Sequence, residues 1–540
     1  MPSARPAALL DATPDILVLG GGLAALVAAL TAHEQNRRVA IASLGPVGRS
    51  GNTAVAENAI SGVTNHPDNT VEAFVQDLLC SGKGVTDPAL AASLAGHSHE
   101  ALLLLKRYGV QFYHKDGDFA RLPPVPGHTV ARTIRADTSS MGHAFKGRAY
   151  LTPLTERAKE AGIPFLNGLR AVRLLQRDGH ICGVMFHERK TGNIFIQPAR
   201  RVILATGGYA GLFKNTSNVS DSYGDGISLA LQAGCPVRDM EMVQFIPAIL
   251  QGRLRMPIST QSLAFGAVLR NRDGERFMFR YDPSGDLAPR DAMARAIYSE
   301  IQAGRGVNDA IYLDCTPVPE DAYATSLASF AKRLQLCGID PRRDTFLGAP
   351  GTHYSMGGVV VDRDGRTPIP GLYAAGEVIG GVHGANRIGG AALAEATVFG
   401  RLAALAASLD DVPTVSPEVT DIPSPACDEE LAAVTTDLKQ LRALLWERAG
   451  IVRDRTGLAQ GLKSIANLLE RWNASSHAPG QAFANTLRIA EAIIRSALLR
   501  TESRGAHYRS DHPEMDPAWN VSIHCSLRNG ECILDRVAQK

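Results

Sequence analysis

Three consecutive glycines, Gly20 to Gly22, separate a short apolar run at residues 15–20 from a stretch with helical spacing at residues 23–35. A second apolar run follows at residues 38–43. Strand, tight turn, helix and strand within roughly 30 residues are typical of the βαβ unit that opens a doubly wound parallel sheet. The sequence therefore predicts an α/β fold with the glycines at the carboxyl end of its first strand.

The glycine turn also has the pattern of a dinucleotide site. Residues 20–25 read Gly-Gly-Gly-Leu-Ala-Ala and fit G-x-G-x-x-A. The first glycine permits the turn, the second lets the backbone approach a pyrophosphate, and the last small residue lets the helix pack on the sheet. The acidic residue expected at the end of the second strand is absent, and Ser43 stands there. This position therefore does not distinguish FAD from NAD.

Other strand candidates lie far along the chain, at residues 201–206, 358–362 and 372–378. The nucleotide-binding domain must then be assembled from two segments. We expect these boundaries: 1–237 and 351–407 for the nucleotide-binding domain, 238–350 for an insertion rich in turn signals, and 408–540 for a C-terminal helical domain that follows a Pro/Ser-rich linker.

Composition excludes several classes of protein. The chain has 56 basic and 54 acidic residues, a balance that argues against a general nucleic-acid binder. None of its 8 cysteines forms a CxxC pair, so we expect free thiols, no iron–sulfur cluster within the chain and no metal site. The N-terminus lacks the apolar segment of a secretory signal, and no run reaches the ~20 apolar residues of a membrane span. We therefore expect a cytoplasmic protein without a transmembrane segment.

Several longer motifs follow the glycine turn in a fixed order. They include RSGNTAVAENAI, VILATGGYAGLF, LAPRDAMARAI, HYSMGGVVVD, GLYAAGEV, GVHGANRIGG and ESRGAHYRSD. This series resembles the succinate dehydrogenase/fumarate reductase flavoprotein family, which includes L-aspartate oxidase, over nearly the whole chain. The resemblance implies a Rossmann-like FAD-binding domain in two segments, an inserted α+β capping domain and the helical C-terminal domain.

The same resemblance implies which residues contact FAD. They are Gly20, Gly21, Gly22, Ala24, Ser43, Ser50, Gly51, Asn52, Thr53, Ala54, Ala171, Asp225, Glu377 and Leu393. Members with covalent FAD carry a histidine in the loop that here reads Ser50-Gly51-Asn52-Thr53, so non-covalent FAD is implied. The family's usual Gln-Gly-Gly is replaced by residues 57–59, Glu-Asn-Ala, so contacts at the flavin edge are expected to differ.

Three residues match the family's catalytic positions. Arg290 matches the arginine that gives or takes the proton, while His353 and Arg387 match the pair that holds a substrate carboxylate. The expected reaction moves a hydride between flavin N5 and a CH–CH or C=C bond next to that carboxylate. The planar guanidinium of an arginine is suited to hold the substrate carboxylate, because it binds a carboxylate through two parallel hydrogen bonds.

The opposite end of the expected pocket departs from the family. Ile246 replaces the histidine that binds a second carboxylate, and Thr260, Leu263 and Phe265 replace the polar Glu, Arg and Glu that follow. A second carboxylate buried there would lack its partners, so we expect a monocarboxylate with an apolar far end. The lost Arg and Glu also belong to the family's proton relay, so protons would reach Arg290 by water or Thr260.

Alternatives remain open at this point. Arg132, Arg135 or His143 could supply the missing charge for a second carboxylate. The chain could also be an amino-acid oxidase like L-aspartate oxidase. A third alternative is the flavoprotein subunit of an electron-transfer complex with an iron–sulfur partner, because the segment at 504–520 resembles that of complex-forming flavoproteins.

Overall fold

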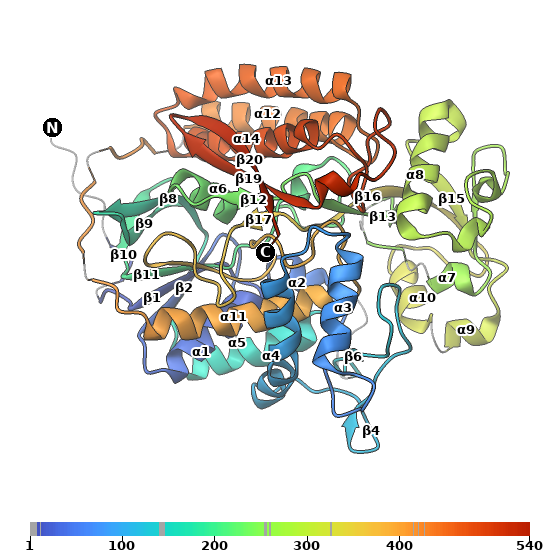
Figure 1. The fold of residues 1–540 in the computed structure, drawn as a ribbon, viewed down its shortest axis with the longest axis horizontal. Coiled ribbons are helices and arrows are strands. Elements are labelled where there is room, and N and C mark those ends of the chain that lie inside the picture. The colour runs from blue at the N-terminus through green and yellow to red at the C-terminus, as the bar shows by residue number, and fades with distance from the viewer. Residues whose placement is uncertain are drawn as a thin grey trace.

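The computed structural model describes residues 8–10, 12–139, 146–252, 256–258, 261–324, 327–413, 415–419, 421–425 and 427–539. Its centre is a five-stranded parallel sheet in the order β18-β11-β1-β2-β7 (Figure 1). The strands are β1 (Ile16–Leu19), β2 (Val39–Ser43), β7 (Phe165–Asn167), β11 (Arg201–Leu204) and β18 (Leu372–Ala374). Because β18 lies after the insertion, the predicted assembly from two segments is confirmed.

Helices cover one face of this sheet, where α1 (Leu23–Glu34), α5 (Arg148–Glu160) and α11 (Ala391–Leu409) lie together (Figure 1). A second, antiparallel sheet of β8 (Leu169–Arg177), β9 (His180–Glu188) and β10 (Ile194–Pro198) contacts β2 and β11. Helices α1 and α11 approach each other closely at Gly400. A Cβ at this position would lie only 2.8 Å from the carbonyl oxygen of Ala24. Small residues at this crossing therefore set the spacing of the two helices.

Among the described residues, one helix, α11, is long and apolar enough to cross a membrane. Within the protein, 78% of that apolar stretch is buried, and α11 packs against α1 and α4 (Pro88–Arg107). This is the pattern of a core helix.

The insertion forms a domain with its own hydrophobic core. Its antiparallel sheet has the order β13-β16-β15-β14, from β13 (Val243–Leu250), β14 (Val268–Arg270), β15 (Ile311–Asp314) and β16 (Thr345–Ser355). The helices α7 (Gln261–Ala264), α8 (Arg290–Glu300), α9 (Glu320–Ala324) and α10 (Ala328–Gln335) accompany it. Strand β16 leads back from this domain into the second segment of the nucleotide-binding domain.

The strand predicted at 358–362 differs from expectation. It forms only β17 (Gly358–Val359), which pairs antiparallel with β12 (Val237–Arg238) instead of joining the parallel sheet. Strand β17 belongs to a different sheet, because its partner β12 also pairs with β19 (Val521–Arg528). Strand β19 in turn pairs with β20 (Glu531–Ala538). The C-terminal region thus adds a hairpin to its helices α12 (Asp428–Arg448), α13 (Arg455–Asn473) and α14 (Ala478–Leu499).

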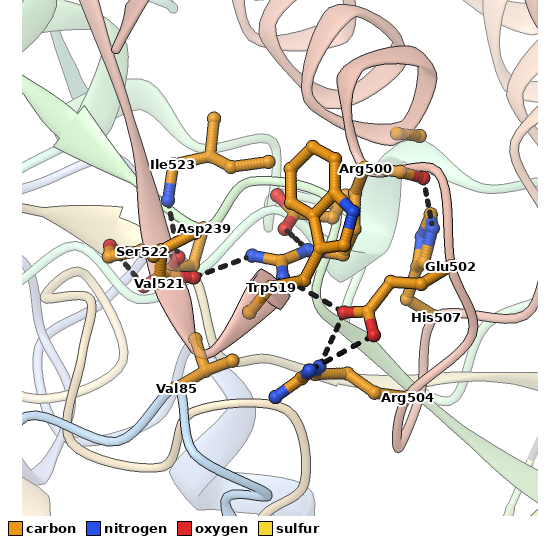
Figure 2. A network of polar contacts seen from close by, with 12 residues as sticks. Val85, Asp239, Arg500, Glu502, Arg504, His507, Trp519, Val521, Ser522 and Ile523 are labelled. Atoms are coloured by element: carbon orange, nitrogen blue, oxygen red, sulfur yellow. Dashed lines mark hydrogen bonds and ion pairs between the residues drawn. The ribbon is translucent and has the colours of Figure 1, made fainter. Parts of the chain in front are cut away.

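A buried ionic network joins the C-terminal region to the rest of the protein (Figure 2). Arg500 is fully buried, and its guanidinium donates to Glu241 Oε1 at 2.7 Å and to Glu502 Oε1 at 3.1 Å. It also donates to the carbonyl oxygens of Trp519 at 3.0 Å and Val521 at 3.0 Å. One guanidinium therefore ties the end of α14 to the hairpin and to the segment before β13.

We predict that Arg500→Gln lowers the free energy of unfolding by about 3–5 kcal/mol, because it leaves the buried carboxylate of Glu241 without its cation, while Glu502 keeps Arg504. Urea unfolding of the purified protein measures the loss. Lys159→Gln is the matched control, since Lys159 and Glu156 form an exposed pair with side chains 54% and 59% exposed. That variant is expected to lose under ~1 kcal/mol. Equal losses in the two variants would contradict the account.

Candidate active site

The glycine turn fits tightly between the ends of two strands. Gly20 has φ +127°, and a Cβ there would lie 2.1 Å from the carbonyl oxygen of Ala205, just after β11. A Cβ at Gly21 would lie 2.8 Å from Ser43 Oγ at the end of β2. Larger residues cannot occupy either position, so the backbone here is free of side chains and open to close approach by a ligand. The structure thus brings Gly20, Gly21 and Ser43 together.

The start of α1 can hold an anion. Gly22 is its N-cap and provides no side-chain oxygen to the first turn. The Leu23 N–H donates to Thr53 Oγ1 at 3.3 Å, which brings the loop at 50–54 against the turn. The partial positive charge of a helix N-terminus and its free N–H groups suit a pyrophosphate.

Glu377 links the two segments of the nucleotide-binding domain. Its Oε1 accepts from the backbone N–H and the hydroxyl of Ser355, both at 3.1 Å, and its Oε2 accepts from Asn52 Nδ2 at 3.3 Å. Burial raises the pKa of Glu377 to about 7, against the opposing effect of the Ser355 and Asn52 hydrogen bonds. A carboxylate in this state is ready to accept further hydrogen bonds, such as those from ribose hydroxyls.

The remaining predicted cofactor residues lie in three places. Ser50 and Gly51 belong to the same loop as Asn52, and Ala54 is buried in the short helix α2 (Asn52–Val55) that Gly51 caps. Ala24 and Leu393 are buried in α1 and α11. Asp225 begins α6 (Asp225–Gln232) and pairs with Arg170 at 2.8 Å, next to Ala171 on β8. The carboxylate of Asp225 therefore already has a cation partner.

These features fit FAD, because a tight glycine turn, a helix N-terminus without a side-chain cap and the half-buried carboxylate of Glu377 are joined through the loop at 50–54.

Arg387 lies in the loop between β18 and α11. Its Nη2 donates to Gln244 Oε1 at 2.9 Å, and its Nη1 donates to the carbonyl oxygen of Ile388 at 3.1 Å. Its Nε is buried and has no hydrogen-bond partner among the described residues. Burial lowers the pKa of Arg387, while Tyr354, Glu377 and Glu395 raise it. The guanidinium is thus held by protein on part of its edge and has N–H groups left for an anion.

His353 is half-buried near the end of β16. Its Nδ1 lies 2.8 Å from Ser217 Oγ, and its backbone carbonyl accepts from Asn218 Nδ2 at 2.8 Å. Burial lowers the pKa of His353 to about 3, and the nearby positive charges of Arg387 and Arg290 lower it further. The imidazole is therefore neutral at physiological pH, and Nε2 can donate a hydrogen bond when Nδ1 accepts from Ser217.

Arg290 is the first residue of α8 and has an exposed side chain. Although this side chain is exposed, desolvation by the surrounding protein is the largest cause that lowers the pKa of Arg290, and the charge of Arg387 is the second. The positive charges of Arg290 and Arg387 both lower the pKa of His353, so the three residues lie near enough for their charges to interact. Their elements come from the capping domain, from β16 and from the second FAD-binding segment.

The residues predicted to form an apolar far end are not gathered in one place. Leu263 and Phe265 belong to the hydrophobic core of the capping domain, with Leu263 buried inside it. Ile246 is 8% exposed on β13, opposite Gly351 of β16. Thr260 lies outside the described residues. Of the three that the structure describes, only Ile246 lies on the strand pair that carries His353.

The structure also bears on the alternative cations. Arg132 is fully buried, with Nη2 2.9 Å from an oxygen of Asp77 and its guanidinium over the Phe74 ring, so its charge is already paired. Arg135 is exposed at the end of β6 (Thr133–Arg135). Burial lowers the pKa of Lys146, and the positive charge of Arg135 lowers it further. His143 lies outside the described residues.

Sequence reasoning missed a second charge cluster beside the site. Glu57 pairs with Lys146 at 2.8 Å and, across the domains, with Arg333 of α10 at 2.8 Å. Glu57 also acts on His353, whose pKa it raises. The replacement of the family's Gln-Gly-Gly by Glu-Asn-Ala was the available signal, but the two cations lie far away in sequence. This cluster joins the capping domain to the FAD-binding domain.

One group of metal-ligating residues lies outside this site, at the starts of α12 and α14. Ligand atoms of Cys427, Glu430 and His477 lie within 4.8 Å of one another. Glu430 Oε2 is 2.8 Å from His477 Nδ1, so the carboxylate and the imidazole already pair directly.

The chain is similar to known flavoproteins over most of its length. Residues 15–393 match the family model described as FAD binding domain, and residues 438–531 match fumarate reductase flavoprotein C-term. The chain is 35% identical over 506 residues to L-aspartate oxidase of Caulobacter vibrioides, covering 93% of this chain and 94% of the relative. It is 32% identical over 536 residues to a subunit of the fumarate reductase (CoM/CoB) of Methanothermobacter marburgensis, covering 94% and 96%.

Solved structures give the same result. Mycobacterium smegmatis Sdh1 in complex with UQ1 superposes with a TM-score of 0.84 at 30% identity, covering 98% of this chain and 95% of that chain. A point mutant of FrdA from Escherichia coli quinol fumarate reductase gives 0.82 at 25% identity, covering 97% and 96%. The chain therefore belongs to the succinate dehydrogenase/fumarate reductase flavoprotein family, which includes the L-aspartate oxidases, and is an FAD-dependent oxidoreductase.

Proposed function

We propose that the enzyme transfers a hydride between flavin N5 and a CH–CH or C=C bond next to a carboxylate. The observation that carries this proposal is the convergence of Arg290, Arg387 and His353 on one site, where the two arginines have lowered pKa values. When bound, FAD supplies the hydride chemistry. The protein supplies a site for an anion and a group that exchanges a proton.

Arg387 and the neutral His353 hold the substrate carboxylate in this proposal. Arg387 has N–H groups that neither Gln244 nor Ile388 uses, and His353 can offer Nε2 while Ser217 occupies Nδ1. Arg290 exchanges the proton with the carbon beside the carboxylate. An arginine is a weak acid in water. Limited hydration and the like charge of Arg387 both move its pKa downward, toward easier release of a proton.

The finer features of the proposal concern the cofactor and the far end of the substrate. FAD is non-covalent, because the loop at 50–53 has no histidine to carry it. The far end of the substrate is apolar, because Ile246 stands on β13 where the family has a histidine. Lys146 and Arg333 share the charge of Glu57, which leaves them less available to a second carboxylate.

A second candidate is an amino-acid oxidase, and a third is the flavoprotein subunit of an electron-transfer complex. The similarity to L-aspartate oxidase, at 35% identity, supports the first of these. The similarity to a subunit of a fumarate reductase, at 32% identity, supports the other. Anaerobic photoreduction of the flavin, followed by reoxidation with unsaturated carboxylates, tests the leading proposal. Turnover of L-aspartate under oxygen, or co-purification of an iron–sulfur protein, would favour the alternatives.

The first prediction from this proposal concerns cofactor attachment. Acid precipitation of the purified protein is expected to release all of its FAD into the supernatant, because Gly51 and Asn52 occupy the loop where a histidine would form the covalent bond. Absorbance of the supernatant and the pellet in the visible flavin band measures the partition. Yellow colour that stays with the pellet would refute non-covalent attachment.

The second prediction is a pH dependence of FAD binding. The carboxyl of Glu377 has its pKa raised to about 7 without ligand, so it is protonated below that pH. Hydroxyl donors of FAD favour the ionised form, so FAD affinity is expected to rise up to about tenfold per pH unit as pH increases toward neutrality and to level off above it. Fluorescence titration of FAD-stripped protein from mildly acidic to mildly basic pH measures this. Glu377→Gln should remove the slope, and an unchanged slope would contradict the assignment.

The third prediction concerns proton transfer. Arg290→Lys is expected to keep FAD and the fold while losing nearly all turnover, since lysine keeps the charge but lacks the planar fork and the reach of arginine. Steady-state kinetics and FAD content are the measurements. If the variant kept more than about a tenth of the wild-type kcat, a barrier change under ~1.4 kcal/mol, Arg290 would not be the proton-transfer group.

The fourth prediction concerns specificity. Crotonate, an unsaturated monocarboxylate, is expected to reoxidise the reduced enzyme with a higher kcat/KM than fumarate. Each buried CH₂ gains about 0.8 kcal/mol, whereas a second carboxylate at Ile246 would lose hydration without a partner. The matched variant Ile246→His should shift the ratio toward fumarate. A roughly tenfold wild-type preference for fumarate would reject the apolar far end and would point to Lys146, Arg333 or Arg135 as the second cation site.

A further inference from the structure

A triad of buried polar side chains, Tyr354, Glu395 and His383, lies behind Arg387. In the proposed function Arg387 binds the substrate carboxylate, and it is called the carboxylate clamp below. The guanidinium carbon of Arg387 lies 4.7 Å from the centre of the Tyr354 ring. The hydroxyl of Tyr354 donates to Glu395 Oε2, and the same oxygen lies 3.3 Å from His383 Nε2. Tyr354, His383 and Glu395 are 6%, 2% and 1% exposed, so water does not reach these contacts. The triad thus starts at the face of Arg387 and ends inside the core.

The three residues come from three different elements. Tyr354 lies on β16, next to His353, Glu395 lies in the first half of α11, and His383 precedes Arg387 in the same loop. The Tyr354 and His383 rings also meet edge to face, with centroids 5.6 Å apart at 74°. A core helix therefore fixes the ring on which Arg387 lies, and the loop that carries Arg387 packs against the same ring through His383.

The contacts of Arg387 show why its support matters. The protein takes one N–H of Nη2 through Gln244 and one N–H of Nη1 through Ile388. The buried Nε has no partner among the described residues. A carboxylate that pairs with two N–H groups needs the guanidinium plane in one orientation. The ring of Tyr354 provides that plane, and its negative face attracts the cation.

Electrostatics act in the same direction. Burial lowers the pKa of Arg387, while the nearby carboxylates of Glu377 and Glu395 raise it. The pKa of Tyr354 is itself raised, first by burial and then by Glu395, so the hydroxyl remains a donor. The clamp is thus kept charged by the residues that hold it in place.

We propose that Tyr354, Glu395 and His383 are positioning residues for the carboxylate clamp: the Tyr354–Glu395 hydrogen bond fixes the ring that orients Arg387, and His383 packs edge to face against the same ring. This inference rests on the proposed function, in which Arg387 binds the substrate carboxylate. A purely structural role would predict a loss of stability from the missing hydrogen bond and no selective effect on carboxylate binding.

The experiment compares Tyr354→Phe with Tyr373→Phe in the FAD-loaded enzyme. Both tyrosines are buried and donate to a carboxylate. Tyr373 lies on β18, outside the clamp, and donates to Asp410 Oδ2 at 2.8 Å. Crotonate and fumarate are titrated onto the oxidised enzyme, where neither reacts, and the flavin absorbance change gives Kd. Ferricyanide reoxidation of the photoreduced flavin serves as a readout that needs no carboxylate site.

Tyr354→Phe is expected to raise the Kd of the better-bound carboxylate about tenfold, with ferricyanide reoxidation within about twofold of wild type. Tyr373→Phe should change neither quantity by more than about twofold. Glu395→Gln, which keeps an acceptor for the Tyr354 hydroxyl, should lose less affinity than Tyr354→Phe, and Glu395→Ala should lose at least as much.

Arg387→Lys separates the two possible failures. If it weakens binding while Tyr354→Phe changes Kd less than about twofold, the positioning role is overturned and the proposed function stands. A proportional loss of ferricyanide reoxidation in Tyr354→Phe would also overturn it, because the variant would then act by general damage. If neither carboxylate binds wild type, or Arg387→Lys has no effect, the proposed function fails and the inference fails with it.

Discussion

Two arginines with the same charge lie near one histidine, and most features of the candidate site follow from this constraint. Arg387 lowers the pKa of Arg290, and both lower the pKa of His353. Like charges held near one another are unfavourable unless an anion joins them. In the proposed function, a substrate carboxylate between the guanidinium groups relieves this repulsion.

The surrounding fold keeps these charges in place. Gln244 of β13 and the ring of Tyr354 on β16 hold Arg387, while the N-terminus of α8 carries Arg290. The capping domain contributes Arg290, and the second FAD-binding segment contributes Arg387. Glu57 adds a link between the two domains through Arg333. Since each domain supplies one arginine, the site depends on the contact between them.

Local patterns were enough to predict the first βαβ unit and the glycine turn, because both depend on short-range sterics and on apolar periodicity. Residues 16–19 and 39–43 form strands, and Gly20 has the backbone geometry that excludes a side chain. The strand predicted at 358–362 was partly wrong, since its partner β12 and the hairpin beyond it are set by residues far away in sequence. The hairpin of β19 and β20 was not predicted at all.

The candidate site residues also divide into those that sequence motifs could predict and those whose partners depend on tertiary contacts. Arg290, His353 and Arg387 stand in recognisable motifs, and the structure brings them together. Tyr354 and Ser355 could have been suspected from their place in the HYSMGG segment, but their partners could not. The pairing of Glu57 with Lys146 and Arg333 depends on tertiary contacts between domains. Leu263 was expected in the pocket, yet its apolar side chain is buried in the core of the capping domain.

A crystal structure of the oxidised, FAD-loaded enzyme with crotonate tests the central claim most directly, because neither partner can react in that state. We expect the carboxylate to lie within hydrogen-bonding distance of Arg387 and His353, with Arg290 beside the double bond and the methyl group toward Ile246. A carboxylate bound instead at Lys146 and Arg333, with Arg387 and Arg290 making no contact with it, would contradict the claim.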